Sequence, residues 1–242
     1  MVHRIQEGNK YIMRLAVEDL NKYNIEKYFN KIKGNELLDE EEKKSASEVL
    51  QQLNKTCKIT SASKVYTSQE FKISNTRISI GQVSIQGEVF ANDCFHDAMS
   101  VMAFLITVDK GEEKELQANL LSQYYETMWI YAALQGCRDD LVDKYMVSEE
   151  MDDRGVFTPV LGPGYFGIDL MENRQLYELL NGSKMGIVLS DKNQFTPENT
   201  ICGFVVELKS MTEECRNRFN NPCCYCLATK KSCGFCDYKE TT

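Results

Sequence analysis

The N-terminal quarter of the chain has apolar residues at the spacing that predicts helices. Residues 11–29 carry mixed helical signals, because Ile12, Leu15, Ala16 and Leu20 lie at helical spacing. A second helix is predicted from an N-cap at Asp39 to about Lys55, because an acidic first turn precedes an apolar stripe at i, i+3, i+4 and i+7. The stripe consists of Ala46, Val49, Leu50 and Leu53.

From residue 64 onward the pattern changes to short runs that are typical of strands. Residues 65–67, 71–73, 77–80 and 82–85 are rich in β-branched and aromatic residues, with Gly81 and Gly87 as turns or bulges. A short helix is expected after Asn92 or Asp93. Residues 100–108 are almost all apolar, which predicts a central buried strand.

The second half of the chain predicts helices and strands in alternation. A long helix is expected from about residue 112 to 146, with Gly136 as the position where it could break. A helix over 170–180 ends at Asn181-Gly182, strands follow over 185–189 and 200–208, and a last helix covers 211–219. The buried face of the long helix is predicted to consist of Leu116, Leu120, Leu121, Tyr124, Met128, Tyr131 and Ala132.

Together these elements predict an α+β fold with a central antiparallel or mixed sheet flanked by helices. We expect the sheet to include Val101–Val108, Gly186–Leu189 and Ile201–Leu208. Residues 1–210 would form this one domain, and residues 211–242 a small cysteine-rich tail.

The net charge and the composition exclude some classes of binding partner. The 242 residues carry a formal net charge of −8, which argues against nucleic acid and anionic membrane surfaces as partners. The first residues are polar, and no run of apolar residues approaches the 18 or so that a membrane span requires. We therefore expect a cytoplasmic protein with no membrane contact.

The cysteines divide into a scattered group and a terminal cluster. Cys57, Cys94, Cys137 and Cys202 are spread along the chain, and we expect them to be reduced and buried. Near the C-terminus the spacing is CxxC-x6-CxxC, which places thiolates at the separation that a tetrahedral metal site needs. The predicted ligands are Cys223, Cys226, Cys233 and Cys236, although Cys224 could replace Cys226. Structural zinc, an iron–sulfur cluster, and disulfides or free thiols all remain open.

The stretch Leu161-Gly162-Pro163-Gly164-Tyr165 predicts a tight turn between a polar loop and a helix. One interpretation is an ordinary connecting turn with a packed tyrosine. The other is a ligand-binding turn whose backbone N–H groups are exposed.

The segments around this turn carry a resemblance to a known family. Gly164-Tyr165, the following helix, the strand residues 186–191 and the stretch 197–204 are similar to the reactivation domain of cobalamin-dependent methionine synthase, here as a free-standing protein. The resemblance covers most of residues 11–208, and its specific part is 158–204. It implies the same α+β fold.

The resemblance also implies a function. The family domain binds S-adenosylmethionine beside its proline-glycine-tyrosine turn and docks over a cobalamin held by another domain. After accidental oxidation of cob(I)alamin, an electron and the methyl group restore methylcobalamin. Pro163, Gly164 and Tyr165 match the turn, and Asp191 stands where the family has a glutamate. Asp191 is either a ligand for an ammonium group or an exposed loop carboxylate.

The resemblance therefore implies an accessory protein for a corrinoid methyltransferase, with a corrinoid protein and an electron donor as partners. His3 and His96 are not in an Asp-x-His-x-x-Gly pattern, so the cobalamin would belong to the partner. Val160 occupies the position of the arginine that holds the ligand carboxylate in the family, and Arg154 is the upstream substitute. The alternatives are a docking module that has lost S-adenosylmethionine binding and an unrelated zinc-tailed regulatory protein.

Overall fold

Strands β7 (Ala98–Asp109) and β11 (Thr200–Leu208) form the centre of the molecule, because most of their residues are apolar and buried. β7 pairs antiparallel with β3 (Lys58–Thr67) on one side and with β11 on the other. β1 (Val2–Arg4), β2 (Arg14–Asp19) and β8 (Val156–Phe157) complete a six-stranded sheet in the order β1-β2-β3-β7-β11-β8. The computed structural model describes residues 2–4, 14–19, 26–27, 29–30, 38–91, 93–110, 120–147 and 155–220.

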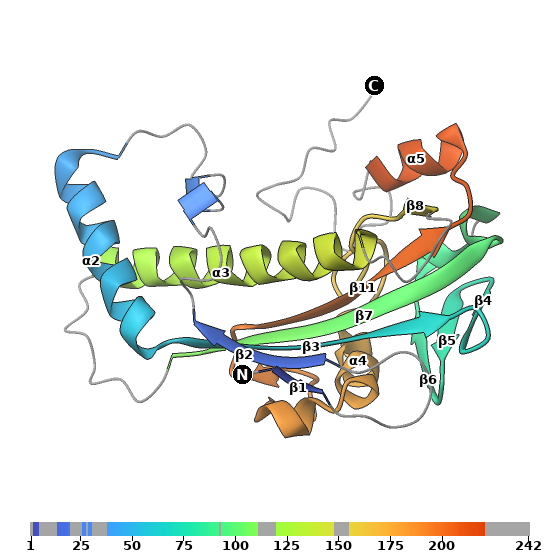
Figure 1. Cartoon of the computed structure of the whole chain (residues 1–242), viewed down its shortest axis with the longest axis horizontal. Coiled ribbons are helices and arrows are strands. Elements are labelled where there is room, and N and C mark those ends of the chain that lie inside the picture. The colour runs from blue at the N-terminus through green and yellow to red at the C-terminus, as the bar shows by residue number, and fades with distance from the viewer. Residues whose placement is uncertain are drawn as a thin grey trace.

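The side chains of β7 alternate between two cores, one on each face of the sheet. Met102, Phe104 and Ile106 pack with α2 (Glu40–Thr56) and α3 (Leu120–Met146). Val101, Ala103 and Leu105 pack with α4 (Asn173–Leu179) and α5 (Glu213–Asn220). Figure 1 shows α3 running along one side of the sheet and α4 on the other.

Smaller elements cover the ends of the sheet. β4 (Phe71–Ser74), β5 (Arg77–Ile80) and β6 (Val83–Gln86) form a three-stranded antiparallel sheet, and β9 (Val188–Leu189) pairs with β10 (Phe195–Thr196). The 3₁₀-helices are η2 (Glu88–Ala91), η3 (Asp93–Phe95), η4 (Leu170–Glu172) and η5 (Gly182–Met185).

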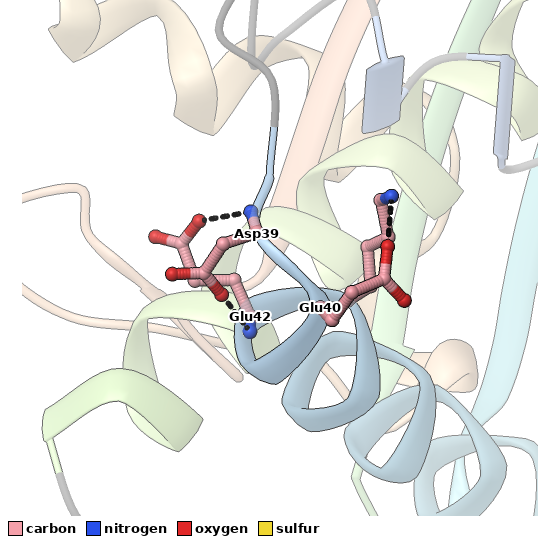
Figure 2. A network of polar contacts seen from close by, with 4 residues as sticks. Asp39, Glu40 and Glu42 are labelled. Carbon is pink, nitrogen blue, oxygen red and sulfur yellow. Dashed lines mark hydrogen bonds and ion pairs between the residues drawn. The ribbon is translucent and has the colours of Figure 1, made fainter.

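The start of α2 confirms the predicted N-cap. Asp39 Oδ1 accepts a hydrogen bond from the Glu42 amide at 2.8 Å, and Glu42 Oε2 accepts one from the Asp39 amide at 2.9 Å (Figure 2). This reciprocal capping box satisfies two backbone N–H groups that the first helical turn leaves without partners.

Two predicted elements are wrong in type or place. Residues 14–19 form strand β2 and not a helix, because pairing with β3 outweighs the helical spacing of a short segment. Residues 188–189 do not join the central sheet but form the short β9–β10 hairpin, since Gly186 turns the chain away with φ of +75°.

The long helix was predicted correctly in type, but it does not break at Gly136. Gly136 is buried in α3, where packing on the sheet outweighs a propensity cost of about 1 kcal/mol. Met128 and Ala132 are buried as expected, whereas Leu120, Leu121, Tyr124 and Tyr131 are exposed. Leu116 lies outside the described residues.

A buried polar network joins β7, β11 and α3. The Ser100 hydroxyl donates to Glu207 Oε2 at 2.5 Å and lies 2.6 Å from the Tyr145 hydroxyl, and the Gly155 amide donates to Glu207 Oε1 at 3.1 Å. Burial of a carboxylate requires such partners. The network fixes the end of α3 against the sheet.

The α+β prediction with a central antiparallel sheet is therefore confirmed. The boundary at residue 210 stays a prediction, and α5, which lies beyond it, packs on the domain through Cys215 and Phe219. No helix in the described part of the chain combines the length and apolar character of a membrane span.

Candidate functional site

The predicted turn lies directly against β11. Leu161 and Phe204 exchange two backbone hydrogen bonds, at 2.9 and 2.8 Å. A Cβ atom at Gly162 would lie 2.8 Å from the Cys202 carbonyl oxygen, and one at Gly203 would lie 2.7 Å from the Leu161 carbonyl oxygen. Both glycines are therefore needed for the close approach of the two backbones.

Backbone N–H groups of the turn form hydrogen bonds to carbonyl groups within the turn itself and just after it. The Gly164 amide donates to the Ile168 carbonyl at 2.8 Å, and the Tyr165 amide donates to the Gly162 carbonyl at 2.9 Å. Gly164 has φ of +85°, a conformation that suits glycine. The expectation of exposed N–H groups is therefore wrong for these two residues, and contacts to a ligand would come from side chains.

The exposure of Tyr165 bears on the interpretation of the turn as a connection with a packed tyrosine. Its side chain is 58% exposed, so it is not a packed core tyrosine. Gly164 is exposed too, whereas Pro163 is buried and shapes the turn from within. Leu170 and Met171, in η4 just after the turn, are also exposed. The turn thus presents an apolar and aromatic surface to solvent.

Tyr131, from α3, meets Tyr165 at this surface. Burial raises the pKa of Tyr131, and the charge and hydrogen bonding of the nearby Tyr165 hydroxyl raise it further, while the Arg138 guanidinium lowers it. Arg138 donates from Nε and Nη2 to Asp139 Oδ1 at 2.9 and 2.7 Å. Two phenol groups, a guanidinium and a carboxylate therefore gather beside the turn.

The sequence of α3 contains a periodicity that indicates this cluster, but the prediction of a buried helix face did not identify it. Tyr124, Tyr131 and Arg138 recur at every seventh position, so they share one face of α3. That face was predicted to be buried, but Tyr124 and Tyr131 are 53% and 42% exposed. The apolar stripe that packs on the sheet lies beside it.

Asp191 lies exposed in the loop between β9 and β10. Asn193, in the same loop, is buried and anchors it. Arg174 Nε donates to Asn193 Oδ1 at 3.0 Å, and Asn173 Nδ2 donates to the Asn193 carbonyl at 3.1 Å. The loop is thus fixed to the start of α4, the segment that follows the turn and η4.

The other sequence-predicted residues fall in two places. Val160 is partly buried against the core on the α3 face, so it offers no polar group to a ligand. Arg154 and all four predicted metal ligands, Cys223, Cys226, Cys233 and Cys236, lie outside the described residues. Within the described ranges, no group of three or more His, Cys, Asp and Glu side chains could hold a metal ion.

One expectation about the cysteines is wrong. Cys94 is buried as predicted but not reduced, because it forms a disulfide with Cys215. Cys57, Cys137 and Cys202 are not in disulfide bonds. Burial raises the pKa of the Cys202 thiol far above its usual range, so it stays protonated. The Cys94 pairing joins residues far apart in the sequence, which spacing alone does not reveal.

Comparison with known proteins supports the fold prediction. The chain is similar to the crystal structure of the MetH (methionine synthase) reactivation domain bound to AdoHcy (S-adenosylhomocysteine), with a TM-score of 0.56 and 14% sequence identity. The match covers 86% of this chain and 80% of that one. No family model and no curated protein matches the sequence. The chain therefore has the fold of the MetH reactivation domain, and the predicted resemblance is confirmed at the level of the fold.

Proposed function

We propose that this chain binds S-adenosylmethionine at the turn 162–167 and presents it to a corrinoid held by a partner protein. In this role it would serve the reductive reactivation of a corrinoid methyltransferase. The observation that carries the proposal is the exposed Tyr165 beside Tyr131, in a fold shared with a domain that binds AdoHcy.

The side chains around the turn fit the ligand chemically. S-adenosylmethionine carries a sulfonium, an ammonium, a carboxylate and an adenosine. The Tyr165 ring offers an exposed face that attracts a sulfonium cation. Asp191, from the exposed loop between β9 and β10, would supply a carboxylate to the ammonium. Pro163 and Gly164 set the direction of Tyr165 through the geometry of the turn.

In the family, an arginine at the position of Val160 binds the ligand carboxylate. In this chain, Arg138 would supply that positive charge instead. Its charge acts on Tyr131, which places it at the tyrosine cluster, and its side chain is 27% exposed. A guanidinium binds a carboxylate through parallel hydrogen bonds. Asp139, which now accepts from Arg138, would compete with the ligand or share the cation with it.

The chain's contribution to the reaction would be positioning. S-adenosylmethionine supplies the methyl group, and the partner's corrinoid accepts it with one electron from a separate donor. Tyr165 and Arg138 would hold the two ends of the methionine moiety so that the sulfonium methyl faces outward. Exposed Leu170 and Met171 would lie at the rim, where the partner docks.

A second candidate is a non-catalytic docking module for a corrinoid protein. Two observations favour it: Val160 stands at the position of the family's arginine, and Arg138 is already paired with Asp139. Such a module would bind the partner without binding S-adenosylmethionine.

Titration calorimetry with S-adenosylmethionine and AdoHcy separates these functions. We expect both ligands to bind, and Tyr165→Ala to weaken binding roughly tenfold because the cation–aromatic contact is lost. The thermal midpoint should stay nearly unchanged, since Tyr165 is exposed. Tyr124→Ala removes another exposed tyrosine from α3 and serves as the matched control. Absence of binding by either ligand would leave the docking module as the function.

A further inference from the structure

α5 reaches the body of the domain through two of its residues. Cys215 forms the disulfide with Cys94 of η3, with Cα atoms 5.6 Å apart, although the two residues are separated by 121 positions in the sequence. One turn later, Phe219 is 5% exposed, and its ring lies edge-on to Phe166 with centroids 6.2 Å apart. The same helix therefore contacts both a disulfide and the candidate ligand turn.

Phe166 is the residue directly after Tyr165, and its backbone conformation depends on its surroundings. Its φ is +53°, which a residue with a Cβ rarely adopts. Its side chain is buried, although that of Tyr165 is exposed. Such a conformation persists only where neighbouring groups hold it, and the Phe219 ring is one of those groups.

The disulfide and the ring contact belong to one continuous packing unit. Phe219 also packs edge-on against Phe95, with ring centroids 5.7 Å apart, and Phe95 follows Cys94 in η3. Hence η3 holds α5 covalently at Cys215 and by packing at Phe219. Any movement of α5 away from η3 would withdraw the ring on which Phe166 rests.

α5 is too short to hold this position by helix formation alone. It has eight residues, and isolated helices of this length are marginal in water. Its buried residues are Cys215 and Phe219. Without the covalent link, α5 would be held by the burial of Phe219 and of the reduced Cys215. Hydrogen bonds from Lys209 and Ser210 to Asp97 would still anchor the segment before α5 but not its last turn, a situation that favours local opening there.

We propose that the Cys94–Cys215 disulfide is a reversible redox latch on the ligand turn. In the oxidised protein, α5 keeps Phe219 against Phe166 and Tyr165 in its binding orientation. In the reduced protein, α5 opens more often, the turn loosens and ligand affinity falls. This inference rests on the proposed function, because the affinity that changes is that of the same site.

Opening the latch requires a dithiol reductant, and closing it again requires a disulfide oxidant that takes back the two electrons by the reverse exchange. A dithiol attacks one sulfur of the pair and forms a mixed disulfide, and the other cysteine leaves as a thiolate that takes up a proton. The second thiol of the reductant then displaces the first cysteine. Overall, two electrons and two protons pass to Cys94 and Cys215, and the reductant leaves as a disulfide.

The first test measures AdoHcy affinity by calorimetry before and after treatment with dithiothreitol, with alkylation and mass spectrometry to confirm the state of the pair. We expect roughly 5- to 10-fold weaker binding after reduction, within the usual range of coupling between sites. The Cys94→Ser/Cys215→Ser variant should bind like reduced wild type and should not respond to dithiothreitol. Cys57→Ala, which removes a buried cysteine outside the pair, should respond as wild type does.

The second test needs no ligand. Hydrogen–deuterium exchange should become faster in α5 and in residues 163–168 after reduction, and stay unchanged in β7. Phe219→Ala should give the same faster exchange with the disulfide intact, whereas Phe219→Leu should give much less. If AdoHcy binds neither state but exchange responds, the proposed function fails and the latch stands. Unchanged exchange in the turn, or alkylation of Cys94 and Cys215 under oxidising conditions, would overturn the latch.

Discussion

The Tyr165 hydroxyl raises the pKa of Tyr131, although the two residues belong to segments that pack on opposite faces of the sheet. Tyr131 projects from α3, and Tyr165 from the turn beside β11. The pair therefore connects the two layers of the domain at the surface where a ligand is proposed to bind. It also gives the site a titratable group whose environment can be measured.

This pair predicts a pH dependence of stability. Burial, and then the Tyr165 hydroxyl, raise the pKa of Tyr131 above its ordinary value of 10. Above pH 10 the unfolded chain loses this proton before the folded one, so stability falls as the pH rises towards the folded-state pKa. Tyr131→Phe removes this contribution, and the free energy of unfolding in urea should fall less steeply between pH 9 and about pH 11.

The control for that experiment is Tyr124→Phe, which removes an exposed tyrosine from the same helix. Burial also raises the pKa values of Tyr66 and Tyr125. The contribution of Tyr66 is the same in both variants and in wild type, whereas Tyr124→Phe also removes the part of the Tyr125 shift that comes from the Tyr124 charge. Equal pH slopes for Tyr131→Phe and Tyr124→Phe would show that the tyrosine pair does not influence stability.

The close approach of Gly162 to β11 predicts a large loss of stability on substitution. In Gly162→Ala the new Cβ would meet the Cys202 carbonyl oxygen at 2.8 Å, so one backbone must shift. We expect a loss of about 3 kcal/mol, at the upper end of ordinary single substitutions. Gly81→Ala is the comparison, because it has positive φ but no atom within 4 Å, and should cost only about 1 kcal/mol. Denaturant unfolding measures both, and equal losses would contradict the close approach.

The buried network around Glu207 predicts the cost of removing one hydroxyl. Ser100→Ala takes a donor away from the buried Glu207 carboxylate and a partner away from the Tyr145 hydroxyl. We expect a loss of about 1–3 kcal/mol in the free energy of unfolding. Ser79→Ala, which removes a hydroxyl 3.4 Å from Ser84 Oγ in a half-buried pair, should cost clearly less. A similar cost for both substitutions would mean that the network adds little to stability.

The parts of the fold that the sequence predicted well are those with local causes. The capping box at Asp39 and the apolar stripe of α2 are both contained within one helix. Residues 100–108 form a buried strand because nearly all of them are apolar, which needs no knowledge of the partner strand. The turn at Gly162–Gly164 was predictable because proline and glycine restrict the backbone locally.

The parts that failed depend on contacts between distant residues. β2 is a strand because β3 lies beside it, and Cys94 is oxidised because folding brings Cys215 to it. Tyr131 was placed in the core because helical spacing does not say which of two adjacent stripes faces the sheet. The same reason explains why Tyr131 and Arg138 were missed as site residues.

The cysteine tail gives the last prediction, which rests on its spacing. Four thiolates at CxxC-x6-CxxC can bind one metal ion if the connection between the two pairs reverses direction, and Gly234 favours a tight turn within the second pair. So short a segment has almost no apolar core, so metal binding would supply most of its folding free energy. Anaerobically purified protein should therefore contain zinc or iron, and chelation should increase hydrogen exchange after about residue 221 while the domain stays folded.

Single substitutions identify the ligands among the tail cysteines. Cys223→Ser, Cys226→Ser, Cys233→Ser and Cys236→Ser should each reduce metal content strongly, because each removes one of four thiolates. Cys224→Ser is the matched control and should retain the metal, since Cys224 is an intervening residue of the first CxxC and not one of the four predicted ligands. Loss of metal in Cys224→Ser but not in Cys226→Ser would instead assign the ligand to Cys224. Protein without zinc or iron, with all five tail thiols open to alkylation, would rule out the site, because a thiolate bound to a metal is protected from the reagent.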